Sequence, residues 1–158
     1  MIIVIGGTKG GTGKSTIVTN LAAIDVGKGN DVLLVDADRQ GSASAWAAVR
    51  EEIEIQRVPS IQKYGGIALT NELKSLTKKY ERIYVDAGGY DSEELRAAIL
   101  AAHTLLIPVR PAQFDVWTLP RINKIVNESK LYNETLRALF VVNGAHTHPN
   151  IHEAEELK

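Results

Sequence analysis

The chain has 158 residues, enough for one domain with a real core, and its 44% hydrophobic and 23% charged residues are ordinary for a globular protein. Its 18 basic and 19 acidic residues give a formal net charge of −1, so any nucleic-acid contact would need a local basic patch. The absence of cysteine excludes disulfides, thiolate metal sites and iron–sulfur clusters, and no apolar run approaches the ~20 residues of a membrane span.

The first predicted element is a buried strand over residues 2–5, and because it begins the chain we expect no signal peptide. A glycine-rich loop follows, and then a helix in which Ile17, Leu21 and Ile24 recur at helical spacing. A strand, a glycine loop and a helix in this order predict a phosphate-binding loop. The curled backbone would present its N–H groups to an anion, and the helix N-terminus would add its dipole.

Two side chains of this loop have distinct expected roles. Lys14 would bring a positive charge to the β- and γ-phosphates, and Ser15 would offer its hydroxyl to Mg²⁺. The chain departs from the general phosphate-loop pattern at Thr8, where a glycine is usual, and it carries an additional lysine, Lys9. A glycine turn that binds nothing is the alternative interpretation. The predicted nucleotide-binding residues of the loop are Lys9, Gly10, Gly11, Thr12, Gly13, Lys14, Ser15 and Thr16.

Strand-like and helix-like segments alternate along the rest of the chain, which indicates one α/β domain over residues 1–158. We expect a doubly wound, mainly parallel sheet with helices on both faces. The predicted strands are 2–5, 32–36, 53–58, 83–86, 104–109 and 139–142, and the predicted helices are 16–24, 42–52, 69–76, 91–102 and 118–130. The helix at 91–102 would begin with a capping box of Asp91 and Glu94. Residues 151–158 resemble a helix that stops abruptly, so we expect a chain truncated at its C-terminus.

Carboxylates follow two of these strands, at the sheet edge where ligands gather. Asp36 and Asp38 point the same way on an extended segment, so one can face a metal shell and the other a water. Asp86 ends the strand 83–86 and would hold Mg²⁺ through water, and Gly88 could offer its backbone N–H to the γ-phosphate. The alternatives are a polar turn capped by Ser42 and an ordinary strand-ending aspartate.

The order Lys-Gly-Gly-x-Gly-Lys-Ser-Thr from Lys9 to Thr16 resembles the deviant Walker A motif of the ParA/MinD group of P-loop ATPases, most closely the small ParA-type partition ATPases. Residues 36–42 are similar to that family's D-x-D-P-Q motif, with Arg39 in place of the proline. By this resemblance Asp38 orients or activates the attacking water and Asp36 supports the metal region. We expect Arg39 to loosen the loop and to add a charge near the phosphates.

The resemblance also implies roles for three residues outside these carboxylates. Two monomers would sandwich two ATP molecules, with Lys9 reaching the partner's phosphates; a solvent-exposed loop lysine is the alternative. Pro111 and Asn143 follow two strands at the same sheet edge and correspond to loops that flank adenine. Asn143 could instead cap the turn before Gly144. The expected catalytic residues are Lys9, Lys14 and Asp38, and the expected metal residues are Ser15, Asp36, Asp38 and Asp86.

The function implied by the resemblance is an ATPase switch that binds ATP or ADP with Mg²⁺, dimerises on ATP, hydrolyses it slowly and drives DNA partition. Its expected partners are non-specific DNA and a centromere-binding, ParB-like adaptor. We expect it in the cytoplasm, on the nucleoid when ATP-bound, without stable membrane association. One alternative is a MinD-like membrane-cycling ATPase, which would need a basic amphipathic C-terminal helix. Another is an ATP-dependent ligase of the dethiobiotin-synthetase kind, which the glycines after Lys9 disfavour.

Two further groups of residues have mundane interpretations that we prefer. Three neighbouring histidines could form a zinc site, but Pro149 and the loop composition argue for a solvated segment. These histidines are His146, His148 and His152. A basic cluster is interpreted as a solvated helix face, and DNA contact is the alternative. The cluster consists of Lys74, Lys78, Lys79 and Arg82.

Overall fold

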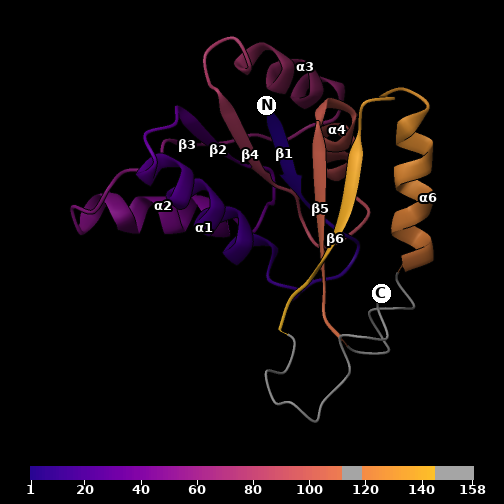
Figure 1. The fold of residues 1–158 in the computed structure, drawn as a ribbon, viewed down its shortest axis with the longest axis horizontal. Helices are drawn as coiled ribbons and strands as arrows, with labels where there is room; N and C mark the ends of the chain where they lie inside the picture. Colours follow the sequence, from indigo (N-terminus) through magenta and orange to yellow (C-terminus); the bar gives the residue numbers. More distant parts are fainter. Residues whose placement is uncertain (112–118, 145–158) are drawn as a thin grey trace.

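The computed structural model describes residues 1–111 and 119–144. The strands are β1 (Ile2–Ile5), β2 (Val32–Asp36), β3 (Ser60–Gln62), β4 (Arg82–Asp86), β5 (Thr104–Val109) and β6 (Arg137–Val142). The helices are α1 (Lys14–Gly27), α2 (Ser42–Glu52), α3 (Ile67–Leu76), α4 (Glu93–Ala101) and α6 (Leu119–Lys130). All six strands form one parallel sheet in the order β3-β2-β4-β1-β5-β6, as Figure 1 shows. The predicted doubly wound α/β fold is confirmed.

Helices cover both faces of this sheet, which explains why its central strands are continuous apolar runs. One core cluster lies between the sheet and the pair α1 and α2, and it contains Ile5, Val18 and Leu34. The other lies on the opposite face against α3, α4 and α6, and it contains Leu73 and Leu95. After β1 the chain winds towards β2 and β3, and after β4 it winds past β1 towards β5 and β6. The crevice where ligands bind in such folds therefore lies beyond the carboxyl end of β1.

Helix α1 buries a different side from the one that its apolar spacing suggests. Its buried side chains include Val18, Ala22 and Asp25, whereas Ile24 is 52% exposed. The Tyr84 hydroxyl donates a hydrogen bond to the Asp25 carboxylate at 2.7 Å, and Arg82 forms an ion pair with the same carboxylate at 3.1 Å. A buried carboxylate with two such partners anchors the helix to β4, because leaving one charge unpaired in a core is strongly unfavourable.

The predicted strand over residues 53–58 is wrong. This segment contains the turn that ends α2, in which Glu54 adopts a left-handed conformation (φ 56°) and the Ile55 N–H donates to the Arg50 carbonyl at 3.2 Å. The edge strand β3 begins only after Pro59, whose carbonyl accepts the Leu34 N–H at 2.8 Å. Proline has no N–H to donate to a ladder, so it suits the residue before this strand rather than its interior.

The predicted start of the fourth helix is also wrong, by one residue. The N-cap of α4 is Ser92, whose hydroxyl accepts the Leu95 N–H at 3.0 Å, because an N-cap oxygen reaches the backbone two or three residues ahead. Asp91 lies before the helix and pairs with Arg96 at 2.6 Å. Strand β6 also begins two residues before the prediction, at Arg137.

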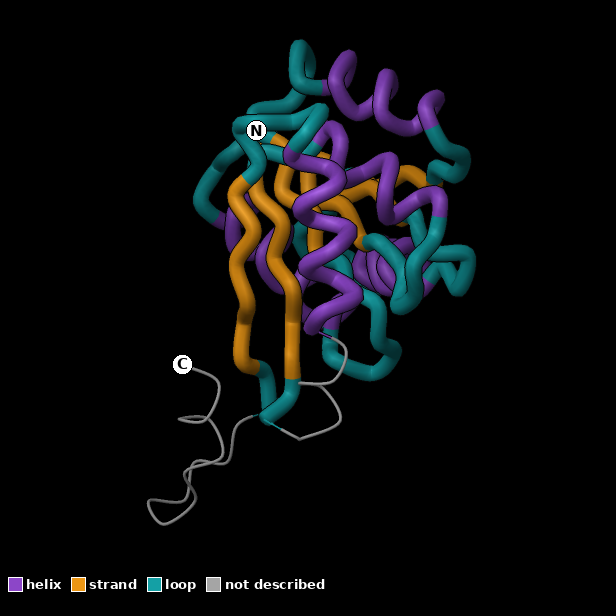
Figure 2. Tube along the Cα trace, turned by 90° about the vertical axis from the view of Figure 1, so that its right-hand side faces the viewer, coloured by secondary structure: helices purple, strands orange, loops and turns teal. Residues whose placement is uncertain are grey.

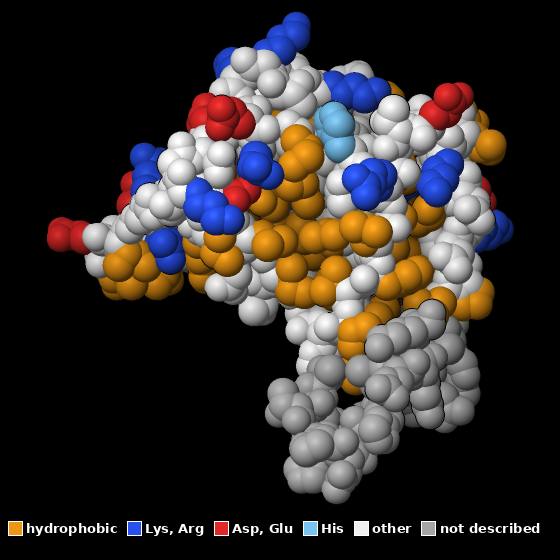
Figure 3. Space-filling model, in the orientation of Figure 1, with side chains coloured by type: hydrophobic (Ala, Val, Ile, Leu, Met, Phe, Trp, Pro, Cys, Tyr) orange, Lys and Arg blue, Asp and Glu red, His pale blue; other side chains and the backbone are white. Residues whose placement is uncertain are grey.

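Strands β5 and β6 run side by side, with α6 beside them, as Figure 2 shows. Among the described elements β6 pairs with β5 alone, so it is an edge of the sheet. Its side chains Leu139, Phe140 and Val142 are 47%, 46% and 39% exposed. Figure 3 shows apolar side chains across the centre of the face in view. None of the described helices is long and apolar enough to cross a membrane.

Candidate nucleotide-binding site

The loop between β1 and α1 has the curled backbone of a phosphate-binding loop. Gly11 and Gly13 have φ angles of 72° and 90°, in the left-handed region that favours glycine. Gly13 is the N-cap of α1, and its carbonyl accepts the Ile17 N–H at 2.9 Å. The free N–H groups of the first turn therefore point into the loop, where an anion would bind.

A cavity of about 290 Å³ opens beside this loop. The residues that line it come from the loop and from the turns after β2 and β4: Gly10, Gly11, Gly13, Lys14, Ser15, Thr16, Asp38, Gln40, Gly89 and Tyr90. Six of the eight predicted loop residues therefore line one cavity together with Asp38. Sequence reasoning missed Gly89 and Tyr90. A Cβ on Gly89 would lie 2.9 Å from the Gly10 Cα and 3.0 Å from the Lys14 Nζ, so this turn closes against the loop.

Lys14 is folded into the loop rather than extended into solvent. Its side chain is only 7% exposed, and its ammonium donates to the Lys9 carbonyl at 2.8 Å. Burial lowers the pKa of Lys14, while the carboxylates of Asp86 and Asp38 raise it. The ammonium is thus held near two acids and one backbone carbonyl, in a position where a phosphate could replace the carbonyl as its partner.

Asp86 is the most unusual group in the site. It is fully buried, and neither carboxylate oxygen has a hydrogen-bond partner among the described residues. Burial raises the pKa of Asp86 to about 6; Asp36 and Asp38 act in the same direction, and the hydroxyl of Ser15 and the charge of Lys14 oppose them. A buried carboxylate without a partner next to a serine hydroxyl is a donor set that Mg²⁺ accepts.

Asp36 shapes the loop after β2. Its two oxygens accept the Asp38 N–H at 3.1 Å and the Ser44 N–H at 2.8 Å, so this side chain caps α2 in place of Gly41, which has no side chain to do so. Among the described residues no group of three acidic or histidine side chains could hold a metal ion. Mg²⁺ would instead be held by few protein oxygens, with phosphate and water completing its shell, as this ion prefers.

Asp38 lies opposite the turn after β4. Its Oδ1 accepts the Gln40 N–H at 3.0 Å, and its Oδ2 would lie 3.3 Å from a Cβ placed on Gly88. The Asp38 carboxylate therefore shapes its own loop and lies beside the predicted switch glycine. The fold brings together Asp38, Gly88 and the phosphate loop, which come from three separate parts of the sequence.

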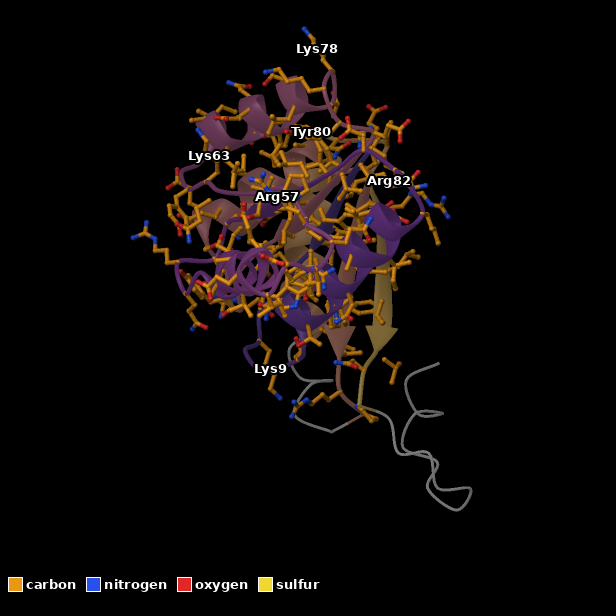
Figure 4. All side chains as sticks on the ribbon, turned by 90° about the vertical axis from the view of Figure 1, so that its left-hand side faces the viewer. Lys9, Arg57, Lys63, Lys78, Tyr80 and Arg82 are labelled. Atoms are coloured by element: carbon orange, nitrogen blue, oxygen red, sulfur yellow. The ribbon has the colours of Figure 1, made fainter. Side chains whose placement is uncertain are left out.

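Asn143 braces the phosphate loop. Its side-chain amide donates to the Thr12 carbonyl at 2.8 Å, and a Cβ on Gly13 would overlap this amide. The side chain thus reaches the loop rather than capping the turn before Gly144. Neither Asn143 nor Pro111 lines the cavity, and contact of either with adenine stays a prediction. The side chain of Lys9 extends away from the ribbon at this end of the molecule, as Figure 4 shows.

Comparison with known proteins agrees with this geometry. Residues 3–155 match a family described as the CobQ/CobB/MinD/ParA nucleotide binding domain. The chain belongs to this family. It is 36% identical over 121 residues to the maintenance of carboxysome distribution protein A of Gloeobacter kilaueensis, covering 70% of this chain and 50% of that relative. The chain therefore spans half the length of this relative.

Two solved structures show the same fold. A plasmid partition protein from Borrelia burgdorferi aligns with a TM-score of 0.76 at 24% identity, over 99% of this chain and 86% of that one. Cobyrinic acid a,c-diamide synthase from Mycobacterium smegmatis, solved with bound ADP and magnesium, aligns with a TM-score of 0.77 at 17% identity, over 99% of this chain and 78% of that one. The expected resemblance to ParA/MinD proteins is thus confirmed at the level of the family.

Two predicted sites remain, the histidine group and the basic cluster. The three histidines of the predicted zinc alternative lie outside the described residues. In the basic cluster, Arg82 pairs with the buried Asp25, and Lys74, Lys78 and Lys79 are exposed. Lys78 and Lys9 lie at opposite ends of the molecule in Figure 4, so this cluster is remote from the nucleotide loop.

Proposed function

We propose that this ParA/MinD-family protein is an ATP-dependent switch that binds ATP or ADP with Mg²⁺ and slowly hydrolyses ATP. The observation that carries the proposal is the arrangement of Lys14 and Asp86. Among the described residues, a buried ammonium that donates to one backbone carbonyl lies near a buried carboxylate whose oxygens have no hydrogen-bond partner. Each group is left in a state that a phosphate and a divalent cation would satisfy.

Different residues of the site have different proposed roles in ATP hydrolysis. The N–H groups of the loop and Lys14 bind the phosphates and orient them. Mg²⁺, held by Ser15 and Asp86, would neutralise charge that develops on the phosphates. Asp38, whose carboxylate lies beside Gly88, would orient the attacking water, and Gly88 would sense the γ-phosphate. Asp36 keeps Asp38 in place through the hydrogen bonds that it accepts.

We test nucleotide binding by titration calorimetry of the parent and Lys14→Ala with ATP and ADP, with and without Mg²⁺. Lys14→Ala should abolish measurable binding, because it removes the fixed charge that faces the phosphates. The matched control is Lys124→Ala on α6, an exposed lysine that lies 3.9 Å from Glu128 and outside the cavity. Equal ATP affinity in Lys14→Ala and the parent would refute the phosphate-loop interpretation.

We further propose that ATP closes a homodimer in which Lys9 contacts the nucleotide of the partner. The cargo of such a switch would be DNA, bound non-specifically, with a ParB-like adaptor stimulating hydrolysis in the cytoplasm or on the nucleoid. The plasmid partition protein supports this proposal through its fold. Co-sedimentation with DNA and with liposomes separates this function from a MinD-like membrane cycle. DNA-dependent pelleting is expected only with ATP, and pelleting with liposomes alone would overturn the assignment.

A second candidate cargo is supported by one observation. The relative at 36% identity is named for the maintenance of carboxysome distribution, so a ParA/MinD-type switch can position a cargo other than a DNA locus. The gene beside this one separates the two candidates. A small DNA-binding protein encoded there would favour partition. The ligase alternative is supported by the similarity to the diamide synthase alone, and at 17% identity this similarity shows a shared fold rather than a shared activity.

A further inference from the structure

An ion pair links the loop after β2 to the first turn of α4. Arg39 lies between Asp38 and Gln40, and its Nη2 is 3.4 Å from the Glu94 Oε1. The Glu94 side chain is 6% exposed, whereas the Arg39 side chain is 74% exposed. The sequence comparison with D-x-D-P-Q predicted that Arg39 would loosen this loop. The structure instead gives the arginine a partner on another element.

The α4 end of this pair is firmly held. Ser92 caps the helix, and Arg96 donates to both oxygens of Asp91 at 2.6 and 3.0 Å. Arg96 also donates to Glu128 on α6 at 2.9 Å, which ties the start of α4 to a neighbouring helix. Glu94 is therefore presented on a fixed element, and Arg39 is the end of the pair that can move with its loop.

The two elements joined by this pair are the ones that carry Asp38 and Gly88. Asp38 precedes Arg39, and Gly88 lies in the turn that leads into α4. We propose that Arg39 is a positioning residue, which through Glu94 holds the Asp38 carboxylate beside Gly88 during ATP hydrolysis. This inference rests on the proposed ATPase function. In this chain, the ion pair restrains the loop after β2, as a proline at position 39 would by fixing the backbone.

A direct contact between Arg39 and the nucleotide is the competing interpretation. The cavity is lined by both neighbours of Arg39, Asp38 and Gln40, but not by Arg39 itself. Its guanidinium is directed to Glu94 instead. The two interpretations differ in what they predict when Glu94 is changed, because a direct contact does not need the carboxylate.

The test is a double-mutant cycle on steady-state ATP hydrolysis, with Arg39→Ala, Glu94→Gln and the double variant. An ion pair with one solvent-exposed partner contributes little, so kcat should fall about two- to five-fold in each single variant, and KM for ATP should be unchanged. The double variant should be no slower than the slower single variant, and Arg39→Lys should recover part of the rate. The matched control is Arg57→Ala, which removes an exposed arginine that lies 3.7 Å from Glu51.

Hydrogen exchange at the amides of Gln40 and Gly41 provides a readout that does not need turnover. Both amides donate to Asp38, so they report how firmly this loop is held. Exchange should be faster in Arg39→Ala and Glu94→Gln than in the parent and in Arg57→Ala. If the parent hydrolyses no ATP but these amides respond, the proposed function fails and the positioning role of the pair stands.

Three results would overturn the inference. The first is unchanged kcat and unchanged exchange in Arg39→Ala. The second is an equal loss from Arg39→Ala in the parent and in the Glu94→Gln background, which would assign Arg39 to a direct contact. The third is a raised KM with unchanged kcat, since this would place Arg39 in nucleotide binding rather than in the positioning of Asp38.

Discussion

Replacing Asp86 by asparagine should stabilise the nucleotide-free protein while it removes Mg²⁺-dependent nucleotide binding. Burial raises the pKa of Asp86 from 3.8 to about 6, so the folded protein holds this proton to a higher pH than the unfolded chain does. Stability therefore falls as the pH rises from about 4 to 6, and the whole penalty is present at pH 7. A difference of about two pH units corresponds to about 3 kcal/mol, an upper figure for what the neutral amide would recover.

The assay is urea unfolding, followed by circular dichroism, of the parent and Asp86→Asn from pH 4 to 8 in EDTA. The free energy of unfolding of the variant should exceed that of the parent at pH 7 by about 1–3 kcal/mol. This difference should shrink below pH 5, where the parent carboxyl is protonated. Asp31→Asn, at an exposed aspartate before β2, is the control. It should change neither the free energy of unfolding at pH 7 nor its dependence on pH.

Calorimetry of the same variant with ATP and Mg²⁺ completes the experiment. Asp86→Asn should show no Mg²⁺-dependent ATP binding. A buried carboxylate without a partner among the described residues would then be unfavourable for stability but required for metal binding, since stability and function often oppose each other at such sites. A variant that is less stable than the parent at pH 7, or whose pH profile runs parallel to that of the parent, would refute the reasoning about Asp86.

Two other substitutions test the division of labour in the site. Asp38→Ala should retain ATP binding and dimerisation but lose hydrolysis, because it removes a water-positioning group without removing phosphate contacts; unchanged turnover would shift the role to Asp36 or Gln40. Lys9→Ala should leave ADP affinity almost intact but weaken ATP-dependent dimerisation and stimulated hydrolysis together, as measured by sedimentation and turnover. Mixing Lys9→Ala with Asp38→Ala subunits should restore some activity, and no recovery despite heterodimer formation would argue against Lys9 acting across the interface.

The sequence by itself determined the features that depend on neighbouring residues. The glycines of the loop permit the left-handed backbone that Gly11 and Gly13 adopt, and the apolar run before them predicts the buried strand β1. Residues 32–35 of β2 and 83–85 of β4 are likewise buried segments that are followed by aspartate. Local rules of this kind reach over a few residues, which is enough to place a strand, a phosphate loop and a helix in order.

Residues that are remote in the sequence were placed by tertiary structure alone. The contact of Asn143 with Thr12 joins residues 131 positions apart, and the pair of Arg39 and Glu94 joins residues 55 positions apart. No local pattern predicts that the turn at Gly89 closes against the phosphate loop, or that the oxygens of Asp86 are left without a described partner. These features depend on how β1, β2 and β4 align at one edge of the sheet, because burial and close approach are properties of the packed molecule rather than of any segment.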